Sequence, residues 1–309
     1  MILGGVEAGG TKFICLVGDD DGRIIARRRL PTRGPATTLA EVIATLRDAA
    51  AAEGPLAAIG VGAFGPVDLR PGPTQGRLLS TPKAGWSGAD LVGPLRDAFG
   101  VPVAIDTDVT AAALAEGRWG AARGLRDHAY MTVGTGIGVG LIANGRPVRG
   151  LVHPEAGHMH VPRMPGDRFP GICPFHGDCL EGMAAGPAMA ARWGMPAEEL
   201  TGQARERAID MEAGYLAAGV RTLIYVAAPG RVIIGGGVAA LPGLLERVRA
   251  HLARNLGDYP GLPEHADPGF VRPPGLGDLA GPKGTLLLAA SAVAQEAPVP
   301  PRTPGGRGG

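Results

Sequence analysis

The sequence contains few cysteines, no excess of charge of either sign and no long apolar run. Its 30 lysine and arginine residues nearly balance 29 aspartate and glutamate residues, so the formal net charge is +1. This balance does not indicate a nucleic-acid or anionic-membrane partner. No apolar run is long enough to cross a bilayer, and Glu7 and Lys12 interrupt the first one before a signal-peptide core can form. We therefore expect a soluble, cytoplasmic protein.

The three cysteines have different sequence surroundings. Cys15 lies in an apolar strand pattern, where a cysteine is typically a small buried hydrophobic residue. Cys173 and Cys179 stand close together, with histidines before and between them. This arrangement suits a metal ion better than a disulfide.

The chain is long and rich in glycine. A chain of 309 residues can form two domains with buried cores. Glycine (52 residues) and proline (29) exceed ordinary usage, and much of the glycine sits in clusters beside apolar β-branched runs. These clusters indicate functional turns. Residues 298–309 are rich in proline, glycine and arginine, and we expect them to be disordered.

Apolar periodicity predicts alternating strands and helices. Strands are expected within 2–17 (a hairpin), 24–30, 56–64, 101–105, 129–133, 141–143 and 231–234. Helices are expected at 38–52, 91–99, 109–119, 184–193, 203–227, 244–256 and 285–296, with a loop at 268–279. This alternation predicts an α/β protein with mainly parallel or mixed sheets.

Two glycine-rich hairpins are candidate phosphate loops. Gly9-Gly10-Thr11-Lys12 interrupts the first strand pair, and Gly134-Thr135-Gly136 follows a later strand. A lone Gly-Gly turn is more often a plain hairpin turn, and strand–loop–strand is not the dinucleotide fingerprint, which leads into a helix. Two matching hairpins, however, suit ATP held between two domains. A third run, Gly235-Gly236-Gly237, fits either a flat ligand such as adenine or a tight turn.

Asp108 is the candidate catalytic carboxylate. It follows a predicted strand and precedes a strong helix former, so it could equally be a helix N-cap. The carboxyl end of a strand is where α/β enzymes place ligand chemistry. Asp106 lies two residues earlier, so the local structure does not need Asp108 for its charge alone. These two points favour catalysis.

Four residues have the spacing of a metal site: His158-x14-Cys173-x2-His176-x2-Cys179. Two thiolates and two imidazoles form a closed tetrahedral set, which predicts structural zinc rather than a catalytic ion. The alternative is that these are unrelated loop residues. If zinc binds, its expected task is to fix the angles of Glu155 and Glu181, each near a ligand in the sequence.

Together these motifs resemble the ROK family of sugar kinases, most closely its bacterial fructokinase branch. The similar segments are residues 7–12, Phe64-Gly65-Pro66-Val67-Asp68, Thr81-Pro82-Lys83-Ala84-Gly85-Trp86, Thr107-Asp108-Val109, Gly134-Thr135-Gly136, His153-Pro154-Glu155, the zinc set with Glu181, and Gly235-Gly236-Gly237-Val238. Glu7 stands where most of the family has Asp, and His176 in the metal set is again similar to the fructokinase branch. Thr110 departs from the Asn that is common at that position.

The resemblance implies a fold and an activity. It implies two actin-like (ribonuclease H-like) α/β domains with ATP and sugar in the cleft between them. The expected domains are residues 1–115, rejoined by helix 285–297, and residues 116–284, which include a zinc loop at 153–181. The implied reaction is ATP-dependent phosphorylation of a hexose, with D-fructose giving fructose 6-phosphate and Asp108 as general base. A homodimer is also expected.

The resemblance also implies roles for particular residues. The expected ATP-binding residues are Gly9, Gly10, Thr11, Lys12, Gly134, Thr135, Gly136, Gly186, Pro187, Gly235, Gly236, Gly237 and Val238. The expected sugar-binding residues are Gly65, Pro66, Lys83, Gly85, Trp86, Thr107, Asp108, Glu155, His158 and Glu181. Mg²⁺ should arrive with ATP, with Glu7 or Asp106 as water-mediated helpers.

Three alternatives remain. Glucose, mannose or N-acetylmannosamine could replace fructose with the same chemistry. ROK sugar-sensing transcription regulators share the sensor body, but they carry a helix-turn-helix segment before it, and the first phosphate loop here begins at Glu7. An actin-like ATPase that does mechanical work would have no use for the zinc set or for the Glu155 and Glu181 pair.

Overall fold

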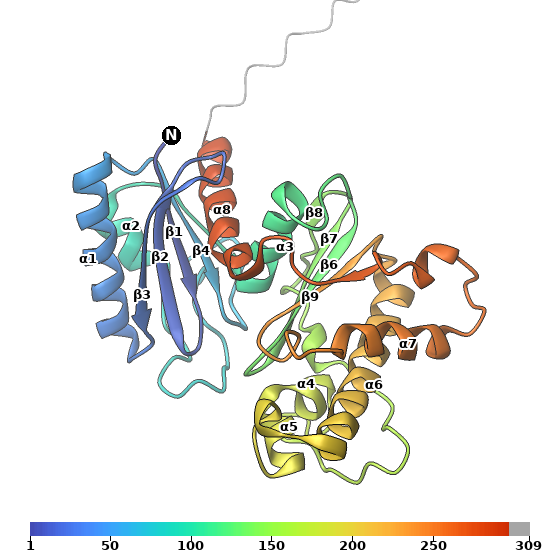
Figure 1. The fold of residues 1–309 in the computed structure, drawn as a ribbon. Helices are drawn as coiled ribbons and strands as arrows, with labels where there is room; N and C mark the ends of the chain where they lie inside the picture. Colours follow the sequence, from blue (N-terminus) through green and yellow to red (C-terminus); the bar gives the residue numbers. More distant parts are fainter. Residues whose placement is uncertain (297–309) are drawn as a thin grey trace, which may run out of the picture.

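The first half of the chain forms a five-stranded mixed sheet in the computed structural model, which describes residues 1–296. Its strands are β1 (Leu3–Ala8), β2 (Lys12–Gly18), β3 (Ile24–Pro31), β4 (Ala58–Ala63) and β5 (Val103–Thr107), in the order β3-β2-β1-β4-β5. The pairs β1–β2 and β2–β3 are antiparallel, whereas β1–β4 and β4–β5 are parallel. Helices α1 (Pro35–Glu53) and α2 (Gly93–Phe99) pack their apolar residues against one face (Figure 1).

The second half forms another five-stranded mixed sheet. Its strands are β6 (His128–Val133), β7 (Ile137–Ala143), β8 (Arg146–Pro147), β9 (Val232–Gly235) and β10 (Val271–Arg272), in the order β10-β9-β6-β7-β8. Four helices complete this half: α4 (Leu180–Ala184), α5 (Gly186–Trp193), α6 (Gly202–Ala227) and α7 (Leu244–Leu256). The largest apolar cluster packs β6, β7 and β9 against these helices. Short 3₁₀ turns η1 (Ala156–His158), η2 (Ala197–Glu199), η3 (Pro263–Ala266) and η4 (Gly277–Leu279) lie in the connections.

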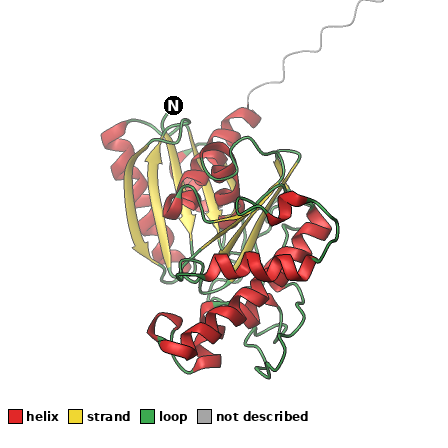
Figure 2. Cartoon of the chain, turned by 45° about the vertical axis from the view of Figure 1, so that its right-hand side comes forward, coloured by secondary structure: helices red, strands yellow, loops and turns green. Residues whose placement is uncertain are grey.

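Two helices lie between the sheets, α3 (Asp108–Trp119) and α8 (Ala280–Glu296) (Figure 1). Glycine allows close approach: a Cβ at Gly284 of α8 would lie 1.9 Å from the carbonyl oxygen of Ala111 in α3, and a Cβ at Gly140 of β7 would lie 2.3 Å from that of Val109 in α3. The fully buried Glu116 carboxylate accepts hydrogen bonds from the backbone of Gly275 and Leu276, both at 2.9 Å. Figure 2 distinguishes the helices from the strands in both halves. Helix α3 packs on strands of both sheets, and α8 packs on α3 and on the first sheet.

The predicted elements agree with these strands and helices in type, with a few shifts. Helix α8 begins at Ala280 instead of 285, and the stretch 268–279, predicted as a loop, contains β10 and η4. The predicted domain boundary at 115/116 falls inside α3, which packs on strands of both sheets, and it stays a prediction. The tail that we expected to be disordered, 298–309, lies outside the described residues.

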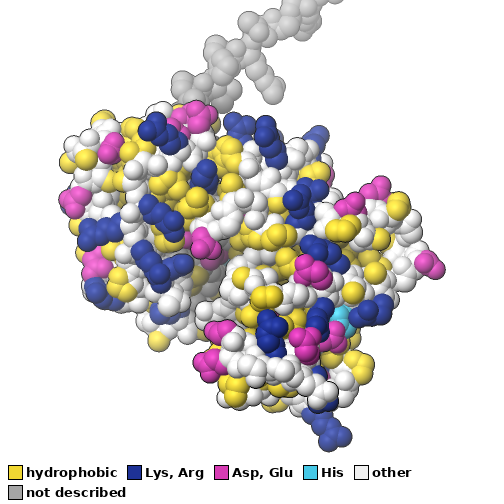
Figure 3. Space-filling model, in the orientation of Figure 1, with side chains coloured by type: hydrophobic (Ala, Val, Ile, Leu, Met, Phe, Trp, Pro, Cys, Tyr) yellow, Lys and Arg dark blue, Asp and Glu magenta, His cyan; other side chains and the backbone are white. Residues whose placement is uncertain are grey.

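The surface carries mixed charge. On the face drawn in Figure 3, basic and acidic side chains are interspersed with apolar and neutral atoms. Within residues 1–296, no helix combines the length and the apolar character that a membrane span requires.

Candidate active site

Asp108 opens helix α3 directly after β5. The N-cap of this helix is Thr107, whose Oγ1 accepts a hydrogen bond from the Thr110 backbone N–H at 3.1 Å. The alternative that Asp108 is the N-cap is therefore wrong. Its carboxylate accepts only the neighbouring Val109 N–H, at 2.8 Å, among the described residues. Burial raises the pKa of Asp108 to about 6. A half-buried carboxylate with this pKa, at the start of a helix, suits a general base.

Thr110, at the position where the family commonly has Asn, interacts with the cap residue. Its hydroxyl lies 2.7 Å from the Thr107 hydroxyl, and both side chains are buried. The pair stabilises the first turn of α3 and hence the position of Asp108.

Two further acids, Glu7 and Glu155, lie near Asp108, and Glu181 lies near Glu155. Burial raises the pKa of Glu7 to about 7, and the Asp108 charge adds to this rise. The pKa of Glu155 is also raised to about 7, by burial and then by the charges of Glu181 and Asp108. Because nearby like charges raise one another's pKa, Asp108 is close to both Glu7 of the first half and Glu155 of the second. The structure thus brings together acids that are distant in the sequence.

Glu181 joins this cluster to the second glycine hairpin. Its Oε2 accepts a hydrogen bond from the Ile137 backbone N–H at 2.9 Å, and a Cβ at Gly136 would lie 2.6 Å from the same oxygen. A candidate sugar-binding acid and a candidate phosphate loop are therefore adjacent.

The predicted metal ligands come together. One ligand atom from each of His158, Cys173, His176 and Cys179 lies within 4.8 Å of all the others. His158 Nδ1 is 3.4 Å from Cys179 Sγ, and Cys173 Sγ is 3.6 Å from Nδ1 of both histidines. A tetrahedron with bonds of about 2.0–2.3 Å has edges of roughly 3.4–3.7 Å. The donor set and its spacing therefore fit a metal ion such as zinc.

His158 contributes to both clusters. Its Nδ1 faces the thiols, and its Nε2 lies 3.9 Å from Glu155 Oε2 and 3.9 Å from Glu181 Oε1. Metal-binding histidines commonly direct their second nitrogen at a carboxylate, which fixes the ring orientation. The ring thus connects the metal set to the two acids.

The candidate ATP residues of the second half meet at the end of β6. The Gly186 N–H donates to the Gly134 carbonyl at 2.8 Å, and the Val238 N–H donates to the Val133 carbonyl at 3.1 Å. Gly236 has φ +94°, and a Cβ there would lie 2.3 Å from the Val133 carbonyl oxygen, so only glycine fits. Three segments separated in sequence therefore form one surface.

Other glycines of these loops are not explained by packing. A Cβ at Gly10, Gly134 or Gly237 would meet no atom within 4 Å, and none of these residues has a positive φ. Open space beside a glycine leaves room for a ligand to approach the backbone. In the first hairpin, the Gly9 N–H donates to the Lys12 carbonyl at 3.0 Å, which closes the turn beneath Gly10.

The sugar-side loops differ in where they lie. Gly65 is adjacent to the acid cluster, since a Cβ there would lie 3.0 Å from Glu155 Oε1. Trp86 instead belongs to the core: it is fully buried, its ring packs against Phe13 in a tilted and Phe64 in an edge-on arrangement, and its indole N–H donates to the Arg33 carbonyl. Lys83 and Gly85 share its loop, and no hydrogen bond or ion pair within residues 1–296 joins the Lys83 side chain to the acids. The expectation that Trp86 lines the sugar site therefore has no support from its side chain.

Asp106 has a different partner from the one that we expected. It is fully buried, it forms an ion pair with Arg149, and it accepts the Thr107 N–H at 2.7 Å. These bonds occupy both carboxylate oxygens, which leaves Glu7 as the better candidate to face a cation. Arg149 follows β8 in the second half, and a single arginine in a turn gave no sequence signal for this contact.

His153 opens the His-Pro-Glu motif, and the sequence alone assigns it no role. It is buried, and it contacts Val67 of the first half and Glu155 of the second. The His-Pro-Glu motif was the available signal, but a motif does not show which atoms a ring faces.

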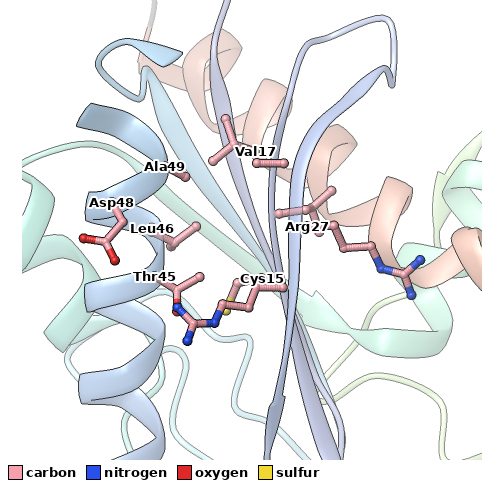
Figure 4. Close-up of a pocket in the computed structure, with 10 residues that line it drawn as sticks. Cys15, Val17, Arg27, Thr45, Leu46, Asp48 and Ala49 are labelled. Atoms are coloured by element: carbon pink, nitrogen blue, oxygen red, sulfur yellow. The ribbon is translucent and has the colours of Figure 1, made fainter. Parts of the chain in front are cut away.

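A groove elsewhere on the first half is separate from these residues. It lies between α1 and the β2–β3 edge, on the face of the sheet opposite α8, and Cys15, Thr45 and Asp48 contribute to its lining (Figure 4). Cys15 is buried in β2 as expected, and burial raises the pKa of its thiol to about 12. This thiol is structural.

Known proteins resemble this chain over nearly its whole length. The fructokinase of Zymomonas mobilis is 42% identical over 295 residues, which cover 94% of this chain and 97% of that protein. The crystal structure of a ROK hexokinase from Thermus thermophilus has a TM-score of 0.79 at 30% identity and covers 96% of this chain and 100% of its own. A Streptomyces griseus ROK glucokinase, solved with glucose and AMPPNP, has a TM-score of 0.73 at 26% identity, with 94% and 100% covered.

These likenesses confirm the predicted fold class of two actin-like α/β domains. The model of the ROK family matches residues 3–292. The chain belongs to the ROK family.

Proposed function

We propose that this protein is a fructokinase that transfers the γ-phosphoryl group of ATP to D-fructose and forms fructose 6-phosphate. The observation that carries the proposal is the proximity of Asp108 to Glu7 and Glu155, together with the contact of Glu181 with the Gly134–Gly136 hairpin. The choice of fructose is supported by relatives named fructokinase at 37–42% identity over most of the chain.

Asp108 acts as the general base. Its carboxylate accepts the proton of the attacking sugar hydroxyl while that oxygen bonds to the γ-phosphorus and the bond to ADP breaks. Phosphoryl transfer depends mainly on positioning and on stabilising charge, so one base and a rigid cleft are enough. The raised pKa makes Asp108 a stronger base than an exposed aspartate, and it remains largely ionised at neutral pH.

The glycine loops bind the nucleotide. Backbone N–H groups at the two hairpins hold phosphate oxygens, with Thr11, Lys12 and Thr135 adding hydroxyls and a positive charge. The surface formed by Gly186, Pro187 and Gly235–Val238 takes the adenosine. The open space beside Gly10, Gly134 and Gly237 supports this assignment.

The sugar is held by the acids of the second half. His158 Nε2 lies 3.9 Å from an oxygen of Glu155 and 3.9 Å from an oxygen of Glu181. These three groups are suited to hydrogen-bond several adjacent hydroxyls of the sugar. Gly65 and Pro66 approach the same place from the first half, and Thr107 acts through the cap of α3.

Two metal ions have distinct places in the proposal. Mg²⁺ on the ATP phosphates would neutralise charge that develops during transfer, and Glu7 is the residue placed to hold its water ligands. Burial and then the Asp108 charge raise the pKa of Glu7 to about 7, and a cation beside it would favour the ionised carboxylate. Zinc would occupy the His158, Cys173, His176 and Cys179 set, where four protein ligands leave no position for a reactant.

The expected homodimer and cytoplasmic location are part of the proposal. A kinase that consumes ATP and a free hexose needs access to both, which supports the cytoplasm. The native mass, measured by light scattering, tests the dimer.

The test is a coupled assay of ADP release with a panel of hexoses, with and without Mg²⁺. We expect Mg²⁺-dependent turnover with the highest kcat/KM for fructose. A higher kcat/KM for glucose, mannose or N-acetylmannosamine would identify that sugar as the substrate in place of fructose, with the same phosphoryl transfer. No turnover with any hexose would reject the kinase.

A further inference from the structure

The buried side chain of His153 joins two loops from opposite halves of the molecule. His153 follows β8 in the second half and is 3% exposed. Val67 lies in the loop after β4 in the first half, and its backbone N–H donates to His153 Nε2 at 3.0 Å. The imidazole therefore ties the 64–68 loop to the segment that carries Glu155.

This hydrogen bond fixes the protonation of the ring. A backbone N–H can only donate, so Nε2 must be the acceptor. Burial lowers the pKa of His153, which keeps the ring neutral near pH 7. In a neutral imidazole the proton is then on Nδ1.

The Nδ1–H group faces two oxygen atoms. Glu155 Oε1 lies 3.3 Å away, and the Pro154 carbonyl oxygen lies 3.5 Å away. The carbonyl can only accept, and the carboxylate accepts when ionised. Nδ1–H is therefore a donor aimed at one oxygen of Glu155.

Glu155 is thus held from two sides. His153 faces Oε1, and His158 Nε2 lies 3.9 Å from Oε2. A Cβ at Gly65 would lie 3.0 Å from Oε1 and 3.2 Å from His153 Cε1, so the three groups are in close contact. Glu155 itself is 39% exposed, and without these neighbours its side chain would have several rotamers open to it.

We propose that His153 is a positioning residue for hexose binding, which orients the Glu155 carboxylate through Nδ1–H and keeps the 64–68 loop against it through Nε2. This inference rests on the proposed function, because it assigns Glu155 to the sugar. It predicts an effect on the KM for the hexose and little effect on the KM for ATP.

Two substitutions separate the two bonds. The amide of glutamine reaches the place of Nε2, so His153→Gln can still accept from Val67 but has no donor at the Nδ1 position. The amide of asparagine overlays Nδ1, so His153→Asn can still donate to Glu155 but leaves the Val67 N–H unpaired. We expect the hexose KM to rise about tenfold in His153→Gln, the scale of a lost hydrogen bond to a charged group, and clearly less in His153→Asn.

A second comparison tests whether His153 acts through Glu155. In a Glu155→Gln background, His153→Gln should change the hexose KM by less than about twofold. The control is His160→Gln, since the exposed side chain of this histidine forms no hydrogen bond or ion pair with the described residues, and its KM values should match those of the unmodified chain. Equal effects of Asn and Gln, or an undiminished effect in the Glu155→Gln background, would overturn the proposal.

Nitrogen NMR of the histidine rings gives a readout that does not depend on activity. The signals that disappear in His153→Gln identify the residue, and we expect the Nδ1–H tautomer at neutral pH. An Nε2–H tautomer would overturn the proposal even in an active enzyme. The kinetic arm uses whichever hexose the unmodified chain phosphorylates best, so a sugar other than fructose corrects the proposed function without deciding His153. If no hexose reacts, the proposed function fails, and the positioning proposal fails with it whatever the tautomer.

Discussion

The Nε2 atom of His158 lies 3.9 Å from Oε1 of Glu181, on the side of the ring opposite the thiols. One imidazole therefore faces a metal-binding cluster with one nitrogen and a candidate sugar-binding acid with the other. Any change in the metal set should reach the acids through this ring.

Metal removal should destabilise the protein. In the loop before Cys179, Val161, Met164 and Phe169 pack on the core of the second half. Ile172 and Phe175, which lie beside the ligands, are exposed, so little apolar contact would hold the ligand-bearing turn without an ion. We expect a chelator to lower Tm by roughly 5–10 °C, as calorimetry can measure. Cys173→Ser should start from the lower Tm and not respond to the chelator, whereas His160→Gln should respond like the unmodified chain. An unchanged Tm after the metal has been stripped would contradict a structural role.

Substitution of the proposed base should abolish turnover. Asp108→Asn keeps the size of the side chain but cannot accept the proton, so kcat should fall about 10²- to 10⁴-fold while ATP binding and Tm change little. The exposed Asp97→Asn on α2 is the matched control and should keep full activity. Retention of more than about a tenth of kcat would show that Asp108 is not the base.

Activity should depend on pH through Asp108. Its pKa is raised to about 6, and only the ionised carboxylate can accept a proton. We therefore expect kcat/KM to rise about tenfold per pH unit below pH 6 and to level off above it. The same rise of kcat/KM with pH should persist in Glu155→Gln, because this variant removes the titration of the neighbouring acid. A flat profile between pH 5 and 7 would be inconsistent with this assignment.

Removal of the Arg149 side chain should leave the buried Asp106 carboxylate without its ion-pair partner. Asp106 is fully buried in β5, and Arg149 supplies its cation from the other half of the molecule. Arg149→Met should lower the free energy of unfolding by about 1–3 kcal/mol, because the arginine is itself 46% exposed and the pair is partly screened. The double variant with Asp106→Asn should recover most of this loss in urea unfolding. Strictly additive losses would mean that the pair contributes nothing.

Glu212 should make stability depend on pH. It is buried on α6, both its carboxyl oxygens lack a hydrogen-bond partner among the described residues, and burial raises its pKa well above 4.5. The folded chain then keeps a proton that the unfolded chain loses above about pH 4.5. The contribution of Glu212 to the free energy of unfolding is complete below about pH 4.5. It declines by about 1.4 kcal/mol per pH unit as the pH rises from there toward the folded-state pKa.

Glu212→Gln should remove this part of the decline of the free energy of unfolding with pH. Urea unfolding between pH 5.5 and 8 measures it, and the exposed Glu198→Gln should leave the slope unchanged. If the slope of Glu212→Gln equals that of the unmodified chain, Glu212 is ionised in the folded state.

The sequence was sufficient for features that depend on neighbouring residues. The metal set was predicted because three of its ligands fall at x2 spacings with a histidine before them, and Asp108 because it stands between a strand pattern and a helix pattern. The strands and helices were predicted from periodicity, and most are found where expected. Local geometry fixes such features wherever the segment lies in the molecule.

The tertiary structure decided which distant residues meet. Val67 and His153 are 86 residues apart and share a hydrogen bond, and Asp106 pairs with Arg149 from the other half. Trp86 lies in a motif predicted to bind sugar, yet its ring fills the core. Contacts of this kind depend on how two sheets and two crossing helices pack, and packing is a property of the whole chain that no short pattern contains.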